Sequence, residues 1–224
     1  MNEKAVVIAS GGIDSSTLLF KTVTENYKTY ALTFIYGQKH RKEIDSAKWI
    51  CERLKVSHKI LDLSVLKDIL SGSALTDSSI AIPEVPAEVL HYDTLKTTIV
   101  PNRNSIFLSI AIGYAVSIGA NRVFFGAHHS DRGVYPDCRP EFVEAFQSAE
   151  RLANDNPYLT VNAPFAHMDK SQIVKLGAEL GVPFGETWSC YRGEDLHCGV
   201  CSSCRERKRA FTQSGVSDPT HYER

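Results

Sequence analysis

Four of the six cysteines in the sequence lie close together near its C-terminal end. They are Cys190, Cys198, Cys201 and Cys204, in the spacing C-x7-C-x2-C-x2-C. Four thiolates on short turns can surround a zinc ion at about 2.3 Å, and Gly199 gives the turn between them conformational freedom. Disulfides are the weaker alternative because the sequence shows no secretory signal, and an iron–sulfur cluster is a minor one. We therefore predict a structural zinc site, with no coordination position left for a reacting water.

The sequence SGGIDS at residues 10–15 follows a short apolar run and precedes a stretch with helical periodicity. Gly11 and Gly12 allow a phosphate to approach the backbone, whose N–H groups favour an anion together with nearby hydroxyls and the helix dipole. No Gly-Lys-Ser/Thr follows, so the turn is not a Walker loop. The alternative is a plain strand-to-helix turn that Asp14 caps. We favour a phosphate site. The residues expected to contact the nucleotide are Ala9, Ser10, Gly11, Gly12, Ile13, Asp14, Ser15, Ser16, Thr17, Leu18 and Leu19.

Further polar residues stand where predicted strands end or predicted helices begin. Arg103 either neutralises charge on a bound triphosphate or belongs to a proline stop with an asparagine cap at the start of a helix. Lys170 is a second candidate phosphate contact, and the alternative is a solvated lysine in a first helical turn. For the pair His128 and His129, we favour hydrogen-bonding or surface roles over metal binding.

Positioning these residues requires alternating strands and helices. Runs typical of strands occur at residues 6–9, 30–36, 58–63 and 122–127, and helical periodicity occurs at 14–25, 43–54, 104–119 and after Asp169. This alternation predicts an α/β fold with a Rossmann-like, doubly wound parallel sheet. The carboxyl ends of its strands, with Gly11–Gly12 and Gly126–Ala127, are expected along one rim that forms the ligand crevice.

The predicted organisation is a nucleotide-binding domain over residues 1–186, followed by a zinc-knuckle segment and a C-terminal helix over residues 187–224. Residues 71–98 break the alternation, because Ser, Thr, Asp and Pro replace periodic apolar residues. Loops of this length are uncommon unless they are functional. We expect this insertion to form a lid over the crevice, and a surface excursion is the alternative.

The composition excludes several classes of function. Among 224 residues, 25 are Lys or Arg and 26 are Asp or Glu, so the net charge of −1 disfavours nonspecific binding to nucleic acid. The most apolar stretch, residues 106–118, falls short of the roughly 20 residues that a membrane helix needs. We therefore expect a cytoplasmic protein without a membrane span, whose partners are small molecules.

The SGGIDS turn resembles the pyrophosphate-binding loop of the N-type ATP pyrophosphatases, which cleave ATP between its α and β phosphates to adenylate a substrate oxygen. Further motifs in order narrow this resemblance to the QueC family of queuosine precursor biosynthesis, from residue 6 to about residue 211. These motifs are YGQ at 36–38, PNRN at 101–104, GAH with YPDC between 126 and 138, and TWSCY at 187–191. The sequence departs from the family pattern at Asn102, where glycine is common, and at residues 128–131, where many members carry an acidic segment.

The resemblance implies a ligase that converts 7-carboxy-7-deazaguanine and ammonia into 7-cyano-7-deazaguanine, with ATP as co-substrate, Mg²⁺ at the phosphates and structural Zn²⁺. Asp14, Arg103 and Lys170 are then candidate catalytic residues. We expect Asp131, Tyr135 and Asp137 to bind the deazaguanine, because carboxylates accept hydrogen bonds from amino and ring N–H groups. A solvated turn explains Asp137 equally well. By analogy with the family, a homodimer is possible.

Two other functions compete with this interpretation. The first is a tRNA-modifying adenylating ligase or thiolase of the same superfamily. Arg205, Arg207, Lys208 and Arg209 favour it locally, whereas Glu206 and the charge of the whole chain oppose it. The second is a zinc-knuckle binding module with an inactive nucleotide fold.

Overall fold

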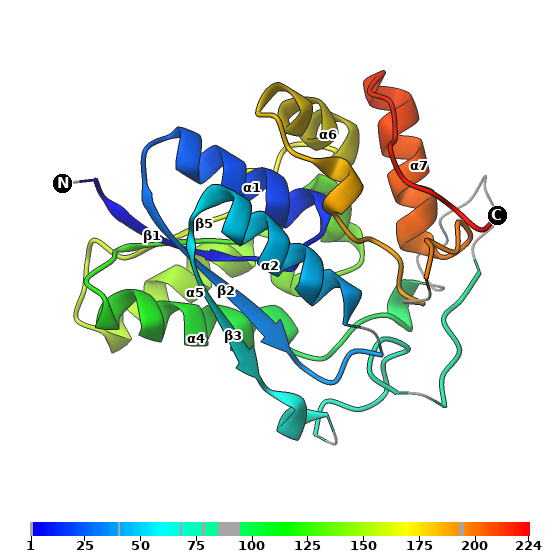
Figure 1. The fold of residues 1–224 in the computed structure, drawn as a ribbon. Coiled ribbons are helices and arrows are strands. Elements are labelled where there is room, and N and C mark those ends of the chain that lie inside the picture. The colour runs from blue at the N-terminus through cyan, green and yellow to red at the C-terminus, as the bar shows by residue number, and fades with distance from the viewer. Residues whose placement is uncertain (1, 40, 68, 78, 85–94, 193–194) are drawn as a thin grey trace.

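Parallel strands form the centre of the molecule (Figure 1). The structure is a computed structural model, and it describes residues 2–39, 41–67, 69–77, 79–84, 95–192 and 195–224. Within these residues the sheet has five strands in the order β3-β2-β1-β4-β5. Their bounds are β1 (Lys4–Ile8), β2 (Lys28–Ile35), β3 (Ser57–Asp62), β4 (Arg122–Phe124) and β5 (Thr160–Asn162). The predicted parallel α/β sheet is confirmed.

Strand β1 lies between β2 and β4, and Val6 is the register partner of Tyr30 on one side and Val123 on the other. The chain first builds the sheet outward through β2 and β3, and then returns to add β4 and β5 on the opposite side of β1. Ligands of such sheets bind beyond the carboxyl ends of the strands where the order reverses, which here is between β1 and β4.

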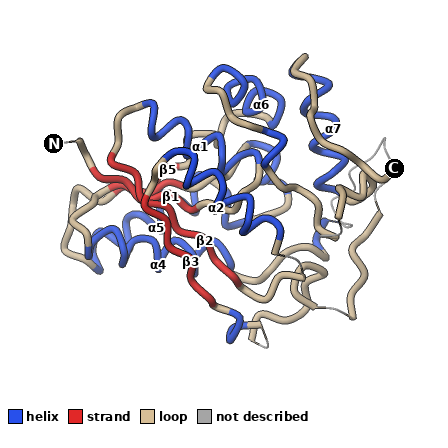
Figure 2. Tube along the Cα trace, viewed as in Figure 1, coloured by secondary structure: helices blue, strands red, loops and turns tan. Residues whose placement is uncertain are grey.

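Helices cover both faces of the sheet (Figure 2). Their bounds are α1 (Ile13–Thr24), α2 (Lys42–Leu54), α4 (Arg103–Ser117), α5 (Pro140–Ala153), α6 (Lys170–Glu179) and α7 (Ser202–Ser214). Short 3₁₀ helices span Ser64–Leu66, His129–Gly133, Pro136–Cys138 and Phe184–Glu186.

The alternation of side chains along β1 explains why two cores form. Ala5 and Val7 point to one face, where they pack with residues of α1, α2, α6 and α7. Val6 points to the other face and packs with residues of α4. All three side chains are fully buried, which is why this strand has an uninterrupted apolar sequence.

Local signals fix where the helices near the site begin and end. Asp169 and Gln172 form a reciprocal capping box at the start of α6, because each side chain bonds the backbone N–H of the other residue. Helix α4 begins after Asn102, which has a φ of 55° and makes no side-chain cap. The asparagine cap, one of the two alternatives for this segment, is therefore not formed by Asn102.

Two details of the strands differ from the sequence prediction, and the lid expected at 71–98 stays a prediction. Strand β4 ends at Phe124 and not at Ala127, and β5 was not predicted. The described part of the insertion at 71–98 contributes to the interior, since residues 73–76 and Thr98 are buried. Residues 85–94, the middle of the expected lid, lie outside the described residues.

The C-terminal segment shares a core with the sheet domain. Helix α7 packs against α6, and Phe211 belongs to the same apolar cluster as Val7 of β1. A division after residue 186 stays a prediction. None of the described helices has the length and apolar character that crossing a bilayer requires.

Candidate active site

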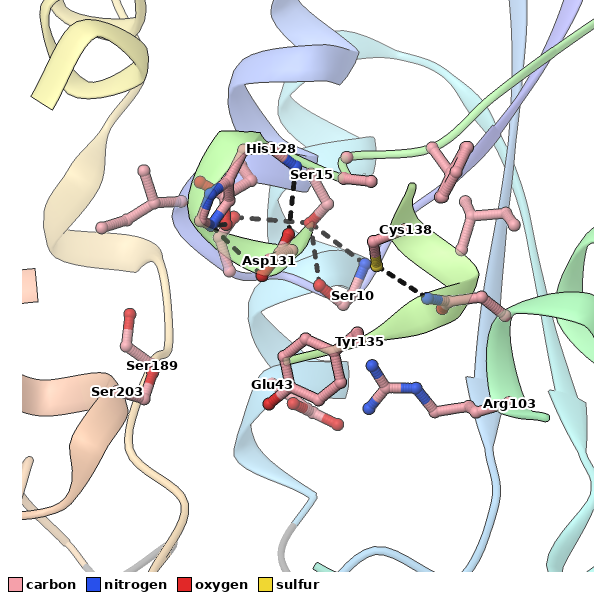
Figure 3. A pocket seen from close by; sticks show the side chains of 18 of the residues that line it. Ser10, Ser15, Glu43, Arg103, His128, Asp131, Tyr135, Cys138, Ser189 and Ser203 are labelled. Carbon is pink, nitrogen blue, oxygen red and sulfur yellow. Dashed lines mark hydrogen bonds and ion pairs between the residues drawn. The ribbon is translucent and has the colours of Figure 1, made fainter. Parts of the chain in front are cut away.

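A cavity of about 300 Å³ opens where β1, β2 and β4 end. Its walls come from the glycine turn after β1, the segments that follow β2 and β4, the first turn of α4, and the cysteine-rich segment with α7. Figure 3 shows side chains from these segments converging on one space. The predicted rim is confirmed, because a Cβ on Gly126 would lie 3.4 Å from the Cβ of Asp14.

The glycine turn is shaped by its own residues. The backbone N–H groups of Ser10 and Gly11 both donate to Oγ of Ser15, at 3.1 Å. Gly11 has a φ of +82°, and a Cβ there would lie 2.0 Å from the carbonyl oxygen of Glu43, so only glycine fits. Gly12 is the N-cap of α1 and no side chain caps the helix. The N-terminal N–H groups of α1 are thus arranged as in an anion site and not as in a turn capped by Asp14.

The residues expected to contact the nucleotide separate into two groups. Those that line the cavity are Ala9, Ser10, Gly12, Ile13, Asp14 and Ser15. Gly11 is not among the lining residues, and Leu18 and Leu19 of α1 point into the core. The hydroxyls of Ser16 and Thr17 are buried and have no hydrogen-bond partner within the described part of the chain.

A charged cluster lies beside the turn. Lys170 Nζ is 3.1 Å from Oδ2 of Asp14 and 2.8 Å from Oε2 of Glu206. His128 Nε2 lies within 4.0 Å of carboxylate oxygens of Asp14, Asp131 and Glu206. The lysine therefore stands as a cation between Asp14 and Glu206, under the further influence of Asp131, at the edge of the phosphate turn.

Burial and charge oppose each other in this cluster. Burial disfavours a charged Lys170, yet attraction to Asp14 and Glu206 outweighs it and raises the pKa of this lysine. Burial also opposes ionisation of Glu206, but Lys170 and His128 hold its pKa below the usual value. For Asp131 burial dominates, and its pKa is raised. Lys170 is thus held in its cationic form, as a phosphate contact requires.

Aromatic side chains and an arginine form another part of the cavity. The guanidinium of Arg103 lies 5.8 Å from the ring centre of Tyr36, whose ring is 5.5 Å from that of Phe107. Tyr135 Oη lies 3.1 Å from Oγ1 of Thr98. Burial raises the pKa of Tyr36 to about 12, so its hydroxyl stays protonated. These flat side chains suit a planar heterocycle.

The three residues expected to bind the heterocycle lie in different places. Asp131 and Tyr135 line the cavity. Asp137 is not among the lining residues, and its carboxylate accepts hydrogen bonds from the backbone N–H and the side-chain amide of Asn104, at 3.0 and 3.2 Å. It therefore holds the first turn of α4, which carries Arg103, and its contact with a substrate stays a prediction.

The cysteine cluster has the geometry of a closed metal site. The four Sγ atoms of Cys190, Cys198, Cys201 and Cys204 lie within 4.8 Å of one another, and all four residues are buried. Cys198 Sγ and Cys204 Sγ are 4.0 Å apart, near the roughly 3.8 Å that a tetrahedral zinc–thiolate site implies. Backbone N–H groups donate to the sulfurs of Cys190 and Cys198, as befits thiolates. This donor set fits zinc.

The cysteine-rich segment is joined directly to the phosphate turn. The N–H of Trp188 donates to the carbonyl of Gly11 at 3.0 Å. Arg207, with 1% of its surface exposed, donates to the hydroxyls of Thr187 and Ser189 at 2.9 and 3.1 Å. The metal centre, α7 and the phosphate turn therefore form one connected wall of the cavity.

Two carboxylates that sequence reasoning missed also face the cavity. Glu206 lies in α7, two residues after Cys204, and was interpreted only as diluting a basic patch. Glu43 lies in the first turn of α2. No local motif identifies either of them, because each reaches the cavity only through the packing of its helix.

Comparison with known proteins gives a consistent result. Residues 4–215 match the family described as queuosine biosynthesis protein QueC. A 7-cyano-7-deazaguanine synthase from Marinobacter nauticus is 48% identical over 100% of this chain and 99% of the relative. One from Archaeoglobus fulgidus is 51% identical over 96% of this chain and 89% of the relative.

Two solved structures share the fold at low sequence identity. NMN synthetase from Francisella tularensis has a TM-score of 0.55 and 17% identity, covering 96% of this chain and 79% of that protein. A 4-thiouridine synthetase, solved with RNA and bound ATP, has a TM-score of 0.52 and 17% identity over 95% of this chain and 50% of that protein.

Proposed function

Because the chain belongs to the QueC family of queuosine biosynthesis proteins, we propose that it makes 7-cyano-7-deazaguanine from 7-carboxy-7-deazaguanine, ammonia and ATP. The identity of 48% with a named synthase over the whole chain supports this activity most strongly. The cavity supports it independently, since an anion-binding turn and a set of aromatic side chains face the same space.

The reaction requires two activations. A carboxylate oxygen of the substrate attacks the α-phosphate of ATP, so that diphosphate leaves and an acyl-adenylate forms. Ammonia then attacks the acyl carbon, and loss of AMP and a proton gives the amide. The amide oxygen attacks the α-phosphate of a second ATP, so that diphosphate leaves again. Loss of AMP and of both N–H hydrogens as protons from the adenylated amide gives the nitrile.

The residues of the turn and the charged cluster serve the phosphates. The N–H groups at the start of α1 and the hydroxyl of Ser10 bind the leaving diphosphate, and Lys170 stabilises the charge that develops on it. Asp14 fits a magnesium ion, because its Oδ1 has no partner among the described residues. When bound there, Mg²⁺ supplies further neutralisation of phosphate charge.

Zinc has a structural role in this proposal. The four cysteines would fill its coordination shell, and the ion would hold the turn from which α7 begins. We further expect the protein to act in the cytoplasm, where thiolates remain reduced. A homodimer stays a prediction.

The basic patch that favours a tRNA-dependent enzyme is smaller in the structure than the sequence alone indicates. Of the basic residues that favoured it, Arg207 is buried and bonded within the protein, and Lys208 donates to the carbonyl oxygen of Arg224 at 2.6 Å. The continuous exposed patch that RNA binding would use is therefore reduced.

The decisive experiment is incubation of the purified protein with ATP, Mg²⁺, ammonium and 7-carboxy-7-deazaguanine, followed by mass spectrometry. We expect the amide first and then the nitrile, with diphosphate release that depends on the deazaguanine. The variant Asp14→Asn should bind the heterocycle and lose turnover. Diphosphate release that depends on tRNA, or ATP binding without any turnover, would contradict the proposal.

A further inference from the structure

Glu43 faces the cavity without a role in the phosphate chemistry. It lies in the first turn of α2, and it is partly buried where the cavity leaves the end of β2. Its Oε1 accepts a hydrogen bond from Nε2 of Gln38 at 3.0 Å. Its Oε2 receives no hydrogen bond from any residue that the structure describes. Gln38 therefore holds this carboxylate through one lone pair of Oε1, and Oε2 and the second lone pair of Oε1 are available to a ligand.

Gln38 is fixed so that it can orient this carboxylate. Its Oε1 accepts from the backbone N–H of Tyr36 at 2.8 Å, and its Nε2 donates to the carbonyl of Phe34 at 3.2 Å as well as to Glu43. The side chain is 9% exposed. Because its carbonyl and amide groups both bond within the protein, Gln38 is a positioning residue that presents Glu43 in one orientation.

Arg103 faces the same part of the cavity as Glu43. Figure 3 shows the two side chains near the ring of Tyr135. The charge of Arg103 acts on Glu43, since Arg103 is among the groups that favour the ionised carboxylate. An acceptor and a set of donors thus line the same cavity together with the aromatic rings of Tyr36 and Tyr135.

This pairing matches one edge of a guanine-type heterocycle. That edge presents a carbonyl oxygen, a ring N–H and an exocyclic amino group in a row. A carboxylate can accept from both N–H groups, and a guanidinium can donate to the carbonyl. Adenine presents an unprotonated ring nitrogen in place of the ring N–H, and a carboxylate repels it.

We propose that Glu43 and Arg103 read the pyrimidinone edge of the substrate, with Glu43 accepting from the ring N–H and the amino group and Arg103 donating to the carbonyl. This inference rests on the proposed function and names the residues that select its heterocycle. It gives Arg103 a binding role in place of charge neutralisation at the triphosphate. It also places the selection of guanine-type rings away from the phosphate end of the cavity. The binding of ATP and the binding of the heterocycle then depend on different residues.

The test compares two substrates in wild type and in Glu43→Gln. The second substrate is the 2-deamino analogue, which keeps the ring N–H and lacks the exocyclic amino group. Wild type should convert the analogue with a KM at least about tenfold above that for 7-carboxy-7-deazaguanine, as expected for loss of a hydrogen bond to a charged group. In Glu43→Gln the KM for the full substrate should rise by a similar factor, and the preference between the substrates should shrink. The KM for ATP should stay unchanged.

Glu52→Gln is the matched control, because Glu52 lies exposed on the same helix. Binding of the substrate in the absence of ATP, measured by the quenching of intrinsic protein fluorescence, gives a readout that is independent of turnover. A rise in the KM for ATP alone would assign Glu43 to the adenosine and overturn the inference, as would an unchanged preference between the two substrates. Failure of the wild type to bind or convert 7-carboxy-7-deazaguanine would instead refute the proposed function.

Discussion

At the scale of single residues, Lys170 is the group whose removal should affect the chemistry most directly. Lys170→Met removes the cation between Asp14 and Glu206 and leaves two carboxylates beside the phosphate turn. We expect kcat to fall by about 100-fold, the usual effect of losing one group that stabilises transition-state charge. The KM for the heterocycle should change little. Steady-state diphosphate release measures both.

Lys175→Met is the control for this variant, since Lys175 is exposed on the same helix and should keep wild-type kinetics. Thermal melts of both variants establish that they are folded. Retention of more than half of the wild-type kcat by folded Lys170→Met would show that this lysine does not act on the phosphates.

The raised pKa of Glu43 leads us to expect that the stability of the folded protein depends on pH. Burial raises its pKa from 4.5 to about 7. The unfolded chain therefore releases this proton at a lower pH than the folded protein, and the folded state loses stability as the pH rises through this interval. Glu43→Gln removes the ionisation. We expect its melting temperature, relative to wild type, to rise between about pH 5 and about pH 8.

Thermal melts across this pH interval make the measurement, with Glu52→Gln as a control that should run parallel to wild type. A constant difference between Glu43→Gln and wild type at every pH would show that Glu43 titrates normally.

Residue patterns revealed those parts of the site that are local in sequence. The cysteine spacing and the SGGIDS turn each place their functional groups within a few residues, so the chemistry can be read without the fold. Glu43 and Glu206 could not be found in this way, because each enters the cavity from a helix whose neighbours in space are distant in sequence. Asp137 shows the converse, since its carboxylate is used to hold a helix start.

At the scale of the elements, two glycines in helices should respond oppositely to substitution by alanine. A Cβ on Gly177 in α6 would lie 2.6 Å from Cζ of Phe184 and 2.7 Å from Oγ1 of Thr17, whereas Gly113 in α4 has no atom within 4 Å of that position. Gly177→Ala should lower the free energy of unfolding by about 1–3 kcal/mol through overpacking. Gly113→Ala should raise it by about 0.5–1 kcal/mol, because alanine favours the helix.

Urea unfolding monitored by circular dichroism measures both variants, and each is the control for the other. If Gly177→Ala were as stable as wild type, the close packing of α6 on α1 would be wrong.

The elements that were predicted well are those with long, uniform patterns. Strand β1 and helices α1, α2 and α4 carry apolar residues at every position or at helical spacing, so their burial is legible in the sequence. Strand β5 has only three residues, too few to show a period. Residues 73–76 and Thr98 of the insertion are buried although three of these five residues are polar. The hydroxyls of Thr76 and Thr98 donate to the carbonyls of Ser73 and Leu95, and the hydroxyl of Ser73 accepts from the N–H of Leu75.

At the scale of the whole molecule, we expect the metal centre to be required for activity although the four cysteines do not contact the phosphate turn directly. Removing zinc with a chelator should release α7 and the segment that bonds Gly11 through Trp188. We expect loss of diphosphate release together with a lower melting temperature. A chelating dye should report about one zinc ion per chain.

Cys51→Ala is the control for Cys198→Ala. Cys51 lies on the buried face of α2 and is not one of the four clustered cysteines, so its variant should keep zinc and activity. Cys198→Ala should lose both. Full activity in metal-free protein would refute the connection between the zinc segment and the phosphate turn.

The overall arrangement was predictable because alternating strands and helices allow few ways to build a parallel sheet. What could not be predicted is that the C-terminal helix belongs to the same core. Phe211 and Ala210 are apolar positions in a helix that is otherwise strongly polar, and only its packing on α6 shows which side is inside.

The bond between Trp188 and Gly11 joins two segments that lie far apart in the sequence, and this has a consequence for protein synthesis. A ribosome makes the nucleotide-binding turn well before the segment that encloses it. The nascent chain can therefore form its sheet and still lack a closed pocket until the cysteine-rich segment has been made. Abortive products that stop before the cysteines would therefore be unable to consume ATP.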